Sequence, residues 1–129
     1  MNQITVETRS RTDFVKIDRP VNEAVQAAGL TEGVVTVFIP HTTAGVTINE
    51  NADPDVLADL EQVLDHMVPW NNGYRHGEGN TAAHVKASMM GSSVQVIVEN
   101  GQLQLGTWQS LFLCEFDGPR TRQVWVKGI

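Results

Sequence analysis

Three histidines stand beside polar, glycine-containing segments, and histidine is the side chain that most readily binds a metal or carries a proton near neutral pH. His41 follows an apolar run that ends at Pro40, whereas His76 and His84 flank the glycines of one loop. Their ring nitrogens are suitable ligands for Zn²⁺ and other divalent metals. The spacing of these histidines matches no closed zinc motif, so a structural role for any one of them stays open.

The loop before His84 has the features of an anion site. Gly77 and Gly79 allow the backbone to adopt positive φ or to approach a ligand closely. Asn80 then begins a helix, whose unpaired N–H groups and positive end favour phosphate. The side chain of His84, one turn into this helix, would lean back toward the same place. The junction therefore predicts a phosphate-binding site.

Charged residues in or beside these segments could take part in chemistry. Glu50 or Glu78 could act as a general base, and Arg120 could hold a phosphate or carboxylate through two hydrogen bonds. Lys86 could assist the departure of a phosphate group. Arg120 also follows an Asp-Gly-Pro turn, where a solvated role is an open alternative. No P-loop, dinucleotide-binding or Ser-His-Asp pattern is present.

Other conspicuous side chains have simpler explanations. Asp53 is expected to cap a helix and Asp55 to complement its positive end. Trp108 is expected in the core or at an interface. Cys114 lies on an apolar strand and is expected to be a buried, unreactive thiol.

The elements that must position these residues are mostly strands joined by turns. Apolar alternation and apolar runs predict strands over residues 4–9, 14–18, 33–39, 94–98, 103–105, 109–116 and 121–126. Capping signals predict helices over residues 20–28, 54–67 and 81–91. Turn-linked strands pair antiparallel. The expected fold class is therefore α+β, with a mainly antiparallel sheet or sandwich core and two or three short helices in a single domain, residues 1–129.

Two of these elements carry extra information. The 54–67 helix has one apolar stripe, which should face the core, and an acidic face for solvent. The 109–116 strand is apolar on both faces. That pattern fits either an oligomer interface or a strand buried within one subunit, and the sequence does not separate the two.

Composition limits the partners. The formal net charge is −6 and the basic residues form no run, which argues against binding to nucleic acid or to an anionic membrane surface. One cysteine excludes an intramolecular disulfide and favours a reducing, cytoplasmic location. The first residues show neither a basic segment nor an apolar one, so no secretory leader is expected among them. No apolar run approaches the roughly 20 residues of a membrane span.

Three stretches resemble the YjbQ-type family, also named the secondary thiamine-phosphate synthase family. They are HTTAGVTINENADPDV (41–56), YRHGEGNTAAHVKASMMG (74–91) and NGQLQLGTWQSLFLCEFDGPRTRQVWV (100–126). The resemblance implies a small β-sandwich-like domain that forms homotrimers with sites near subunit boundaries. It also implies a metal or ligand site at His41, His76 and His84. The implied activity is a weak thiamine-phosphate synthase activity, which joins hydroxymethylpyrimidine diphosphate to a thiazole phosphate and releases pyrophosphate.

Residue roles follow from the residues and the resemblance together. Glu50, Glu78 and Arg120 are assigned to catalysis; Asn49, Gly77, Gly79, Asn80 and Lys86 to substrate binding; and His41, His76 and His84 to a divalent metal, Zn²⁺ or Mg²⁺. The leading expectation is an enzyme acting on a small phosphorylated substrate. The alternatives are a metal-assisted hydrolase and a non-catalytic oligomeric protein that binds a ligand or metal.

Overall fold

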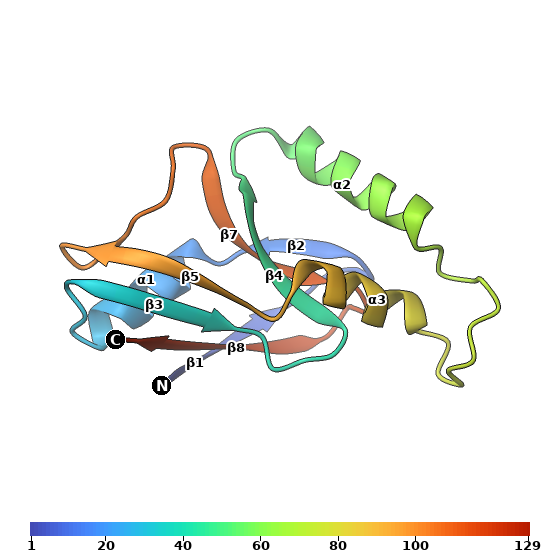
Figure 1. The fold of residues 1–129 in the computed structure, drawn as a ribbon, viewed down its shortest axis with the longest axis horizontal. Helices are drawn as coiled ribbons and strands as arrows, with labels where there is room; N and C mark the ends of the chain where they lie inside the picture. Colours follow the sequence, from blue (N-terminus) through green and yellow to red (C-terminus); the bar gives the residue numbers. More distant parts are fainter.

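The computed structural model describes all 129 residues and contains two antiparallel sheets with three helices (Figure 1). The chain runs β1 (Asn2–Glu7), β2 (Asp13–Lys16), α1 (Asp18–Ala27), β3 (Gly33–Phe38), β4 (Ala44–Glu50), α2 (Pro54–Met67), α3 (Thr81–Met90), β5 (Ser93–Glu99), β6 (Gln102–Leu103), β7 (Gln109–Glu115) and β8 (Thr121–Gly128). The larger sheet has the order β1-β8-β3-β5-β6 and the smaller one β2-β7-β4. The predicted fold class, α+β with a mainly β core, is confirmed.

The main core lies between the two sheets. Strand alternation turns Val124 and Val126 of β8 inward from the larger sheet and Leu111 and Leu113 of β7 inward from the smaller one. Helix α1 contributes to the same core through Val21, Ala24 and Val25. The next inward-facing residue beyond Val124 in β8, and the next one beyond Leu113 in β7, therefore lie at one end of the sandwich interior.

Strand β7 is buried on both faces inside one chain. Its second face carries Phe112 and Cys114, which pack against Leu64 of α2 and against Ala83 and Ala87 of α3. This packing explains the two apolar faces predicted for the strand. The strand is internal to the subunit, so its composition gives no support to an oligomer. Cys114 is a buried free thiol, as predicted, and burial raises its pKa to about 12.

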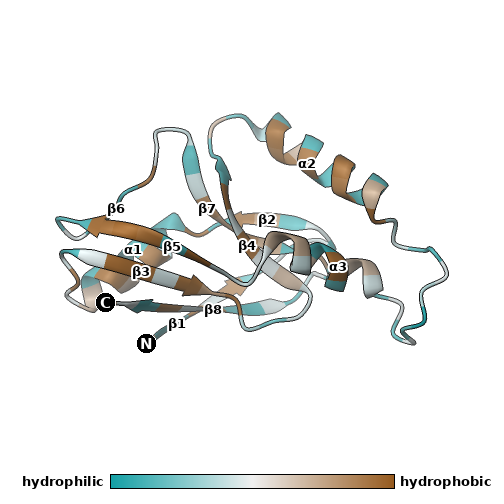
Figure 2. Ribbon diagram, in the orientation of Figure 1, coloured by the Kyte–Doolittle hydropathy of each residue, from teal (hydrophilic) through white to brown (hydrophobic).

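Helix α2 is held only loosely against the rest of the molecule. Asp53 caps it as predicted, through a hydrogen bond from the Asp55 amide to Oδ1 at 2.9 Å. Only Leu64 of its apolar stripe is buried, while Val63 and Met67 are 53% and 60% exposed. The expectation that the whole stripe faces the core is therefore wrong for a single chain. Figure 2 shows α2 at the edge of the molecule with apolar stretches along its length.

The strands and helices differ from the predicted ones in several places, of which an unpredicted strand is the largest. Strand β4 was not predicted, because Gly45, Thr47 and Asn49 break the apolar run of its neighbours. Helix α1 begins before Pro20, at Asp18, whose Oδ1 accepts a hydrogen bond from the Leu111 amide at 2.6 Å. Strand β6 covers Gln102–Leu103, earlier than the predicted 103–105.

None of the three helices combines the length and apolar character needed to cross a bilayer.

Candidate functional site

A buried ion pair joins the two sheets at one end of the sandwich. Arg122 continues the inward row of β8, and Glu115 continues that of β7. Arg122 Nε donates to Glu115 Oε1 at 2.8 Å, and Nη2 donates to Oε2. Both side chains are almost inaccessible to solvent. The pair is the two-pronged arrangement in which a guanidinium and a carboxylate match best.

Neighbouring groups complete the hydrogen bonds of this pair. Thr8 Oγ1 donates to Glu115 Oε1 at 2.8 Å, and the Asp117 amide donates to Oε2 at 3.1 Å. Arg122 Nη2 also donates to Thr43 Oγ1 at 2.7 Å. Burial alone would raise the pKa of Glu115, but the hydrogen bonds from Arg122, the Asp117 amide and Thr8, with the charge of Arg122, hold that pKa below its usual range. Glu115 is therefore ionised and fixes the guanidinium in place.

The ion pair lies beside an open pocket of about 420 Å³. The polar part of its lining is His41, Thr42, Thr43, Ser92, Arg120 and Arg122. Nε and Nη2 of Arg122 are engaged by Glu115 and Thr43, whereas Nη1 makes no hydrogen bond within the chain. The guanidinium of Arg122 is therefore held rigidly beside the pocket, and its Nη1 group can donate to a ligand.

His41 is held in one protonation state by its surroundings. Its Nε2 accepts a hydrogen bond from the Gln123 amide at 2.9 Å. Burial and the positive charges of Arg122 and Arg120 lower the pKa of His41, against a smaller opposing effect of Glu115. A neutral imidazole whose Nε2 accepts a hydrogen bond carries its proton on Nδ1. Nδ1 is therefore the donor that the ring offers to a ligand.

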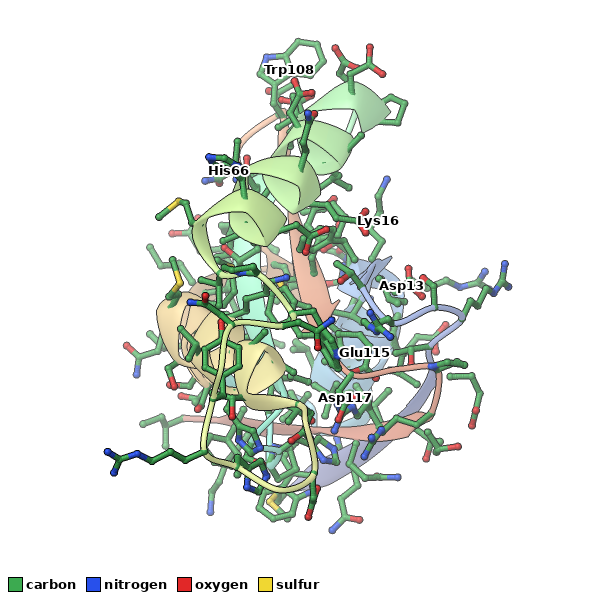
Figure 3. The ribbon with its side chains drawn as sticks, turned by 90° about the vertical axis from the view of Figure 1, so that its right-hand side faces the viewer. Asp13, Lys16, His66, Trp108, Glu115 and Asp117 are labelled. Atoms are coloured by element: carbon green, nitrogen blue, oxygen red, sulfur yellow. The ribbon has the colours of Figure 1, made fainter.

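Asp117 links this pocket to the start of α3. Its Oδ2 accepts from Arg120 Nη2 at 3.1 Å and from Asn80 Nδ2 at 2.8 Å, and Arg120 Nε donates to its backbone oxygen at 2.9 Å. Figure 3 shows Asp117 close to Glu115. Asn80 precedes α3 as expected, but its side chain makes no capping hydrogen bond to the helix. The expected cap is replaced by the bond to Asp117.

His76 and His84, two of the three histidines assigned to a metal, lie beside each other. Their ring centroids are 5.4 Å apart in an edge-to-face arrangement, and Glu78 Oε2 lies 3.9 Å from His76 Nε2. Gly79 has φ +76°, the left-handed backbone for which glycine suits this turn. Gly77 does not have a positive φ.

One chain does not assemble a metal site from the three histidines. No group of three or more His, Cys, Asp or Glu side chains is arranged to hold an ion. In addition, His41 has no unshared nitrogen lone pair left, because Nε2 accepts from Gln123 and Nδ1 carries the proton. The residues present therefore do not fit a three-histidine metal centre within one chain. A metal at His41, His76 and His84 stays a prediction that needs a different arrangement or further donors.

The remaining predicted residues lie away from the His41 pocket. Asn49 and Glu50 are at the opposite end of β4, a strand of 7 residues that spans roughly 20 Å. Glu50 Oε2 accepts from the amides of Ala52 and Asp53, which shapes the turn into α2. Glu50 also lines an open pocket with Trp108, an exposed side chain that Figure 3 shows well apart from Glu115. Lys86 is buried in an ion pair with Asp65 that ties α3 to α2.

Sequence reasoning did not identify Arg122, Thr43 or Thr8 as site residues. Arg122 had a usable signal, since it occupies the inward row of a strand whose next inward positions are Val124 and Val126. A charge in such a row must have a partner, because an isolated buried charge is very unfavourable. Thr43 and Thr8 carried no comparable signal, because their contacts are with residues far along the chain.

Comparison with known proteins matches residues 2–129 to the family model "UPF0047 protein YjbQ-like". The chain is 50% identical over 128 residues to the UPF0047 protein YugU of Bacillus subtilis, covering 98% of this chain and 97% of that one. An uncharacterized YjbQ/UPF0047-family protein from Clostridium acetobutylicum has a crystal structure with 51% identity, TM-score 0.97 and full coverage of both chains. The conserved hypothetical protein TT1486 of Thermus thermophilus is 42% identical with TM-score 0.94, again over both whole chains.

Proposed function

The chain belongs to the UPF0047 family of YjbQ-like proteins, and we propose that it is an enzyme that binds a small phosphorylated molecule in the His41 pocket. The observation that carries the proposal is the buried guanidinium of Arg122, fixed by Glu115 and Thr43 with Nη1 unengaged beside the pocket. A guanidinium held in this way matches a phosphate oxygen without further ordering.

Two further donors point to the same class of ligand. Arg120 lines the pocket and is half exposed, so its guanidinium can reach a bound phosphate. His41 offers Nδ1–H from a neutral ring. Each arginine has a carboxylate behind it, Glu115 or Asp117, so the attraction for an anion comes from directed hydrogen-bond donors more than from net charge.

The reaction that we propose is the transferase reaction implied by the family resemblance. The bond between the methylene carbon of hydroxymethylpyrimidine diphosphate and its diphosphate oxygen would break, which releases pyrophosphate. The same carbon would form a bond to the ring nitrogen of the thiazole phosphate. Arg120 and Arg122 would stabilise the negative charge that develops on the departing pyrophosphate, which is the usual task of guanidinium groups in phosphate chemistry. No step is assigned to a metal, because the donors of one chain do not form a metal site.

We also propose that the protein works as a homotrimer in the cytoplasm. Support for assembly comes from α2 and its surroundings, where Val63, Met67 and Trp108 are more than half exposed. Large apolar side chains left in solvent on one helix are typical of a subunit interface. Support for the cytoplasm comes from Cys114, which is a free thiol.

Turnover with both substrates tests the function. Purified protein is incubated with hydroxymethylpyrimidine diphosphate and thiazole phosphate, and thiamine phosphate and pyrophosphate are measured by liquid chromatography with mass spectrometry. We expect both products in equal amounts from the wild type, and a loss with Arg120→Gln. Phosphate release from either substrate alone would favour the hydrolase alternative. Binding of the substrates without any product would favour a ligand-binding protein.

A further inference from the structure

The carboxamide of Asn80 is buried with its oxygen unused. Asn80 is 9% exposed, and Oδ1 is the one buried side-chain polar atom of the chain without a hydrogen-bond partner. The orientation of the amide is fixed, because Nδ2 donates to Asp117 Oδ2 at 2.8 Å and the reverse orientation would bring two acceptor oxygens together. The unused atom is therefore an acceptor.

The helix that follows does not use this oxygen either. At a helix start an asparagine Oδ1 usually accepts from the amide two or three residues on. Here the amides of Ala83 and His84 donate to the backbone oxygen of Asn80 instead. A buried acceptor without a donor costs free energy, and such groups in folded proteins call for an explanation.

Asn80 is joined to the His41 pocket through one residue. Asp117 Oδ2 accepts from both Asn80 and Arg120, and Arg120 lines that pocket. On its other side, the preceding residue Gly79 lines a second cavity, of about 350 Å³, with His76. Arg120 is the exposed member of this cluster, with 49% of its side chain in solvent. A ligand whose phosphate binds Arg120 would therefore lie next to Asp117, the residue that holds the Asn80 carboxamide in place.

We propose that Asn80 Oδ1 is a specificity determinant that accepts a hydrogen bond from a hydroxyl or amino group of the ligand whose phosphate binds Arg120 and Arg122. This inference rests on the proposed phosphate site. It narrows the ligand to phosphorylated molecules that also carry a hydrogen-bond donor. A site with a buried acceptor discriminates against an analogue that lacks the donor, because that analogue leaves the acceptor unpaired.

Two probes with the same carbon and phosphate skeleton test the inference. Glycerol 3-phosphate carries hydroxyl groups, and propyl phosphate carries none. Dissociation constants are measured by isothermal titration calorimetry for the wild type, for Asn80→Ala and for Gln26→Ala, an exposed amide on α1 that serves as the control. We expect glycerol 3-phosphate to bind the wild type and the control about tenfold more tightly than propyl phosphate. In Asn80→Ala the two probes should bind equally.

The outcomes separate this inference from the proposed function. Equal binding of the two probes to the wild type overturns the role of Asn80 and leaves the phosphate site standing. An unchanged preference of Asn80→Ala for glycerol 3-phosphate, or an equal loss of affinity for both probes, also overturns the role of Asn80 and leaves the phosphate site standing. Failure of both probes to bind the wild type overturns the phosphate site as well. If Asn80→Ala does not fold, the wild-type side-chain amide signal of Asn80 in a ¹⁵N spectrum decides: it should shift with glycerol 3-phosphate only, and an equal response to propyl phosphate overturns the inference.

Discussion

Arg122 Nε lies 2.8 Å from Glu115 Oε1, in a buried pair that joins the larger sheet to the smaller one across the end of the core. The pair has two consequences. It contributes to the stability of the sandwich, and it holds a guanidinium rigidly beside the His41 pocket. The two consequences can be separated by mutation.

Replacing one partner of the pair should destabilise the fold. Glu115→Gln leaves Arg122 buried without its counter-charge, and we expect the free energy of unfolding to fall by about 3–5 kcal/mol. Urea denaturation followed by circular dichroism measures the change. Glu23→Gln removes the exposed pair between Arg19 and Glu23 and should cost less than about 1 kcal/mol. The double variant Glu115→Leu, Arg122→Met should recover stability and still lose phosphate binding. Equal effects of the buried and exposed single variants would contradict the role given to the pair.

The stability of the protein should depend on pH through His41. The folded-state pKa of His41 is lowered from its ordinary value of 6.5, so the unfolded chain binds this proton first as the pH falls. The contribution of neutral His41 to the free energy of unfolding is therefore present above pH 6.5. It is lost as the pH falls from 6.5 toward the folded-state pKa. Urea denaturation at several pH values should show a smaller decline in His41→Gln than in the wild type. His66→Gln, on the exposed side of α2, should behave as the wild type. Identical profiles for all three proteins would contradict the assignment.

The close approach of α3 to β4 should make Gly45 sensitive to any side chain. An added Cβ would lie 2.7 Å from the backbone oxygen of Gly91, which cannot move without displacing the end of the helix. We expect Gly45→Ala to lower the free energy of unfolding by about 1–3 kcal/mol. Gly77→Ala meets nothing within 4 Å and should leave stability nearly unchanged. A stable Gly45→Ala variant would mean that α3 and β4 are further apart than described.

The exposed stripe of α2 should hold the subunits together. Charges at Val63 and Met67, introduced as Val63→Glu with Met67→Glu, should convert the protein to a monomer of 14.2 kDa. Light scattering coupled to gel filtration measures the mass. Gln62→Glu adds a charge to the solvent side of the same helix and should leave the assembly intact. A wild type that is already monomeric would contradict the proposed trimer.

Local patterns in the sequence predicted most of the fold, because alternation, apolar runs and capping residues act over short distances. Asp53 and the strands around Val124 and Leu111 follow such rules. These rules did not predict strand β4, because Gly45 is required by a contact with Gly91, a residue far along the chain. The site was harder for the same reason. Arg122 meets Thr43 and Thr8 meets Glu115 only once the two sheets are assembled.

The residues of the candidate site show which contacts local patterns predict and which they do not. His76 and His84, which flank one loop, lie beside each other. Glu50 was grouped with His41 because both belong to one polar segment, although Glu50 lies at the far end of β4 from His41. Asn80 was expected to cap a helix and instead bonds Asp117, a contact that no local rule contains. Pairings across the sheets, not the residue types, decide which polar groups share the pocket.

Binding of pyrophosphate to the purified protein tests the phosphate site most directly. Isothermal titration calorimetry is carried out on the wild type, on Arg120→Gln in the pocket, and on Arg19→Gln on the exposed face of α1. We expect the wild type and Arg19→Gln to bind with the same dissociation constant, and Arg120→Gln to bind about tenfold more weakly. Absence of binding to the wild type, or equal binding to all three proteins, would contradict the site.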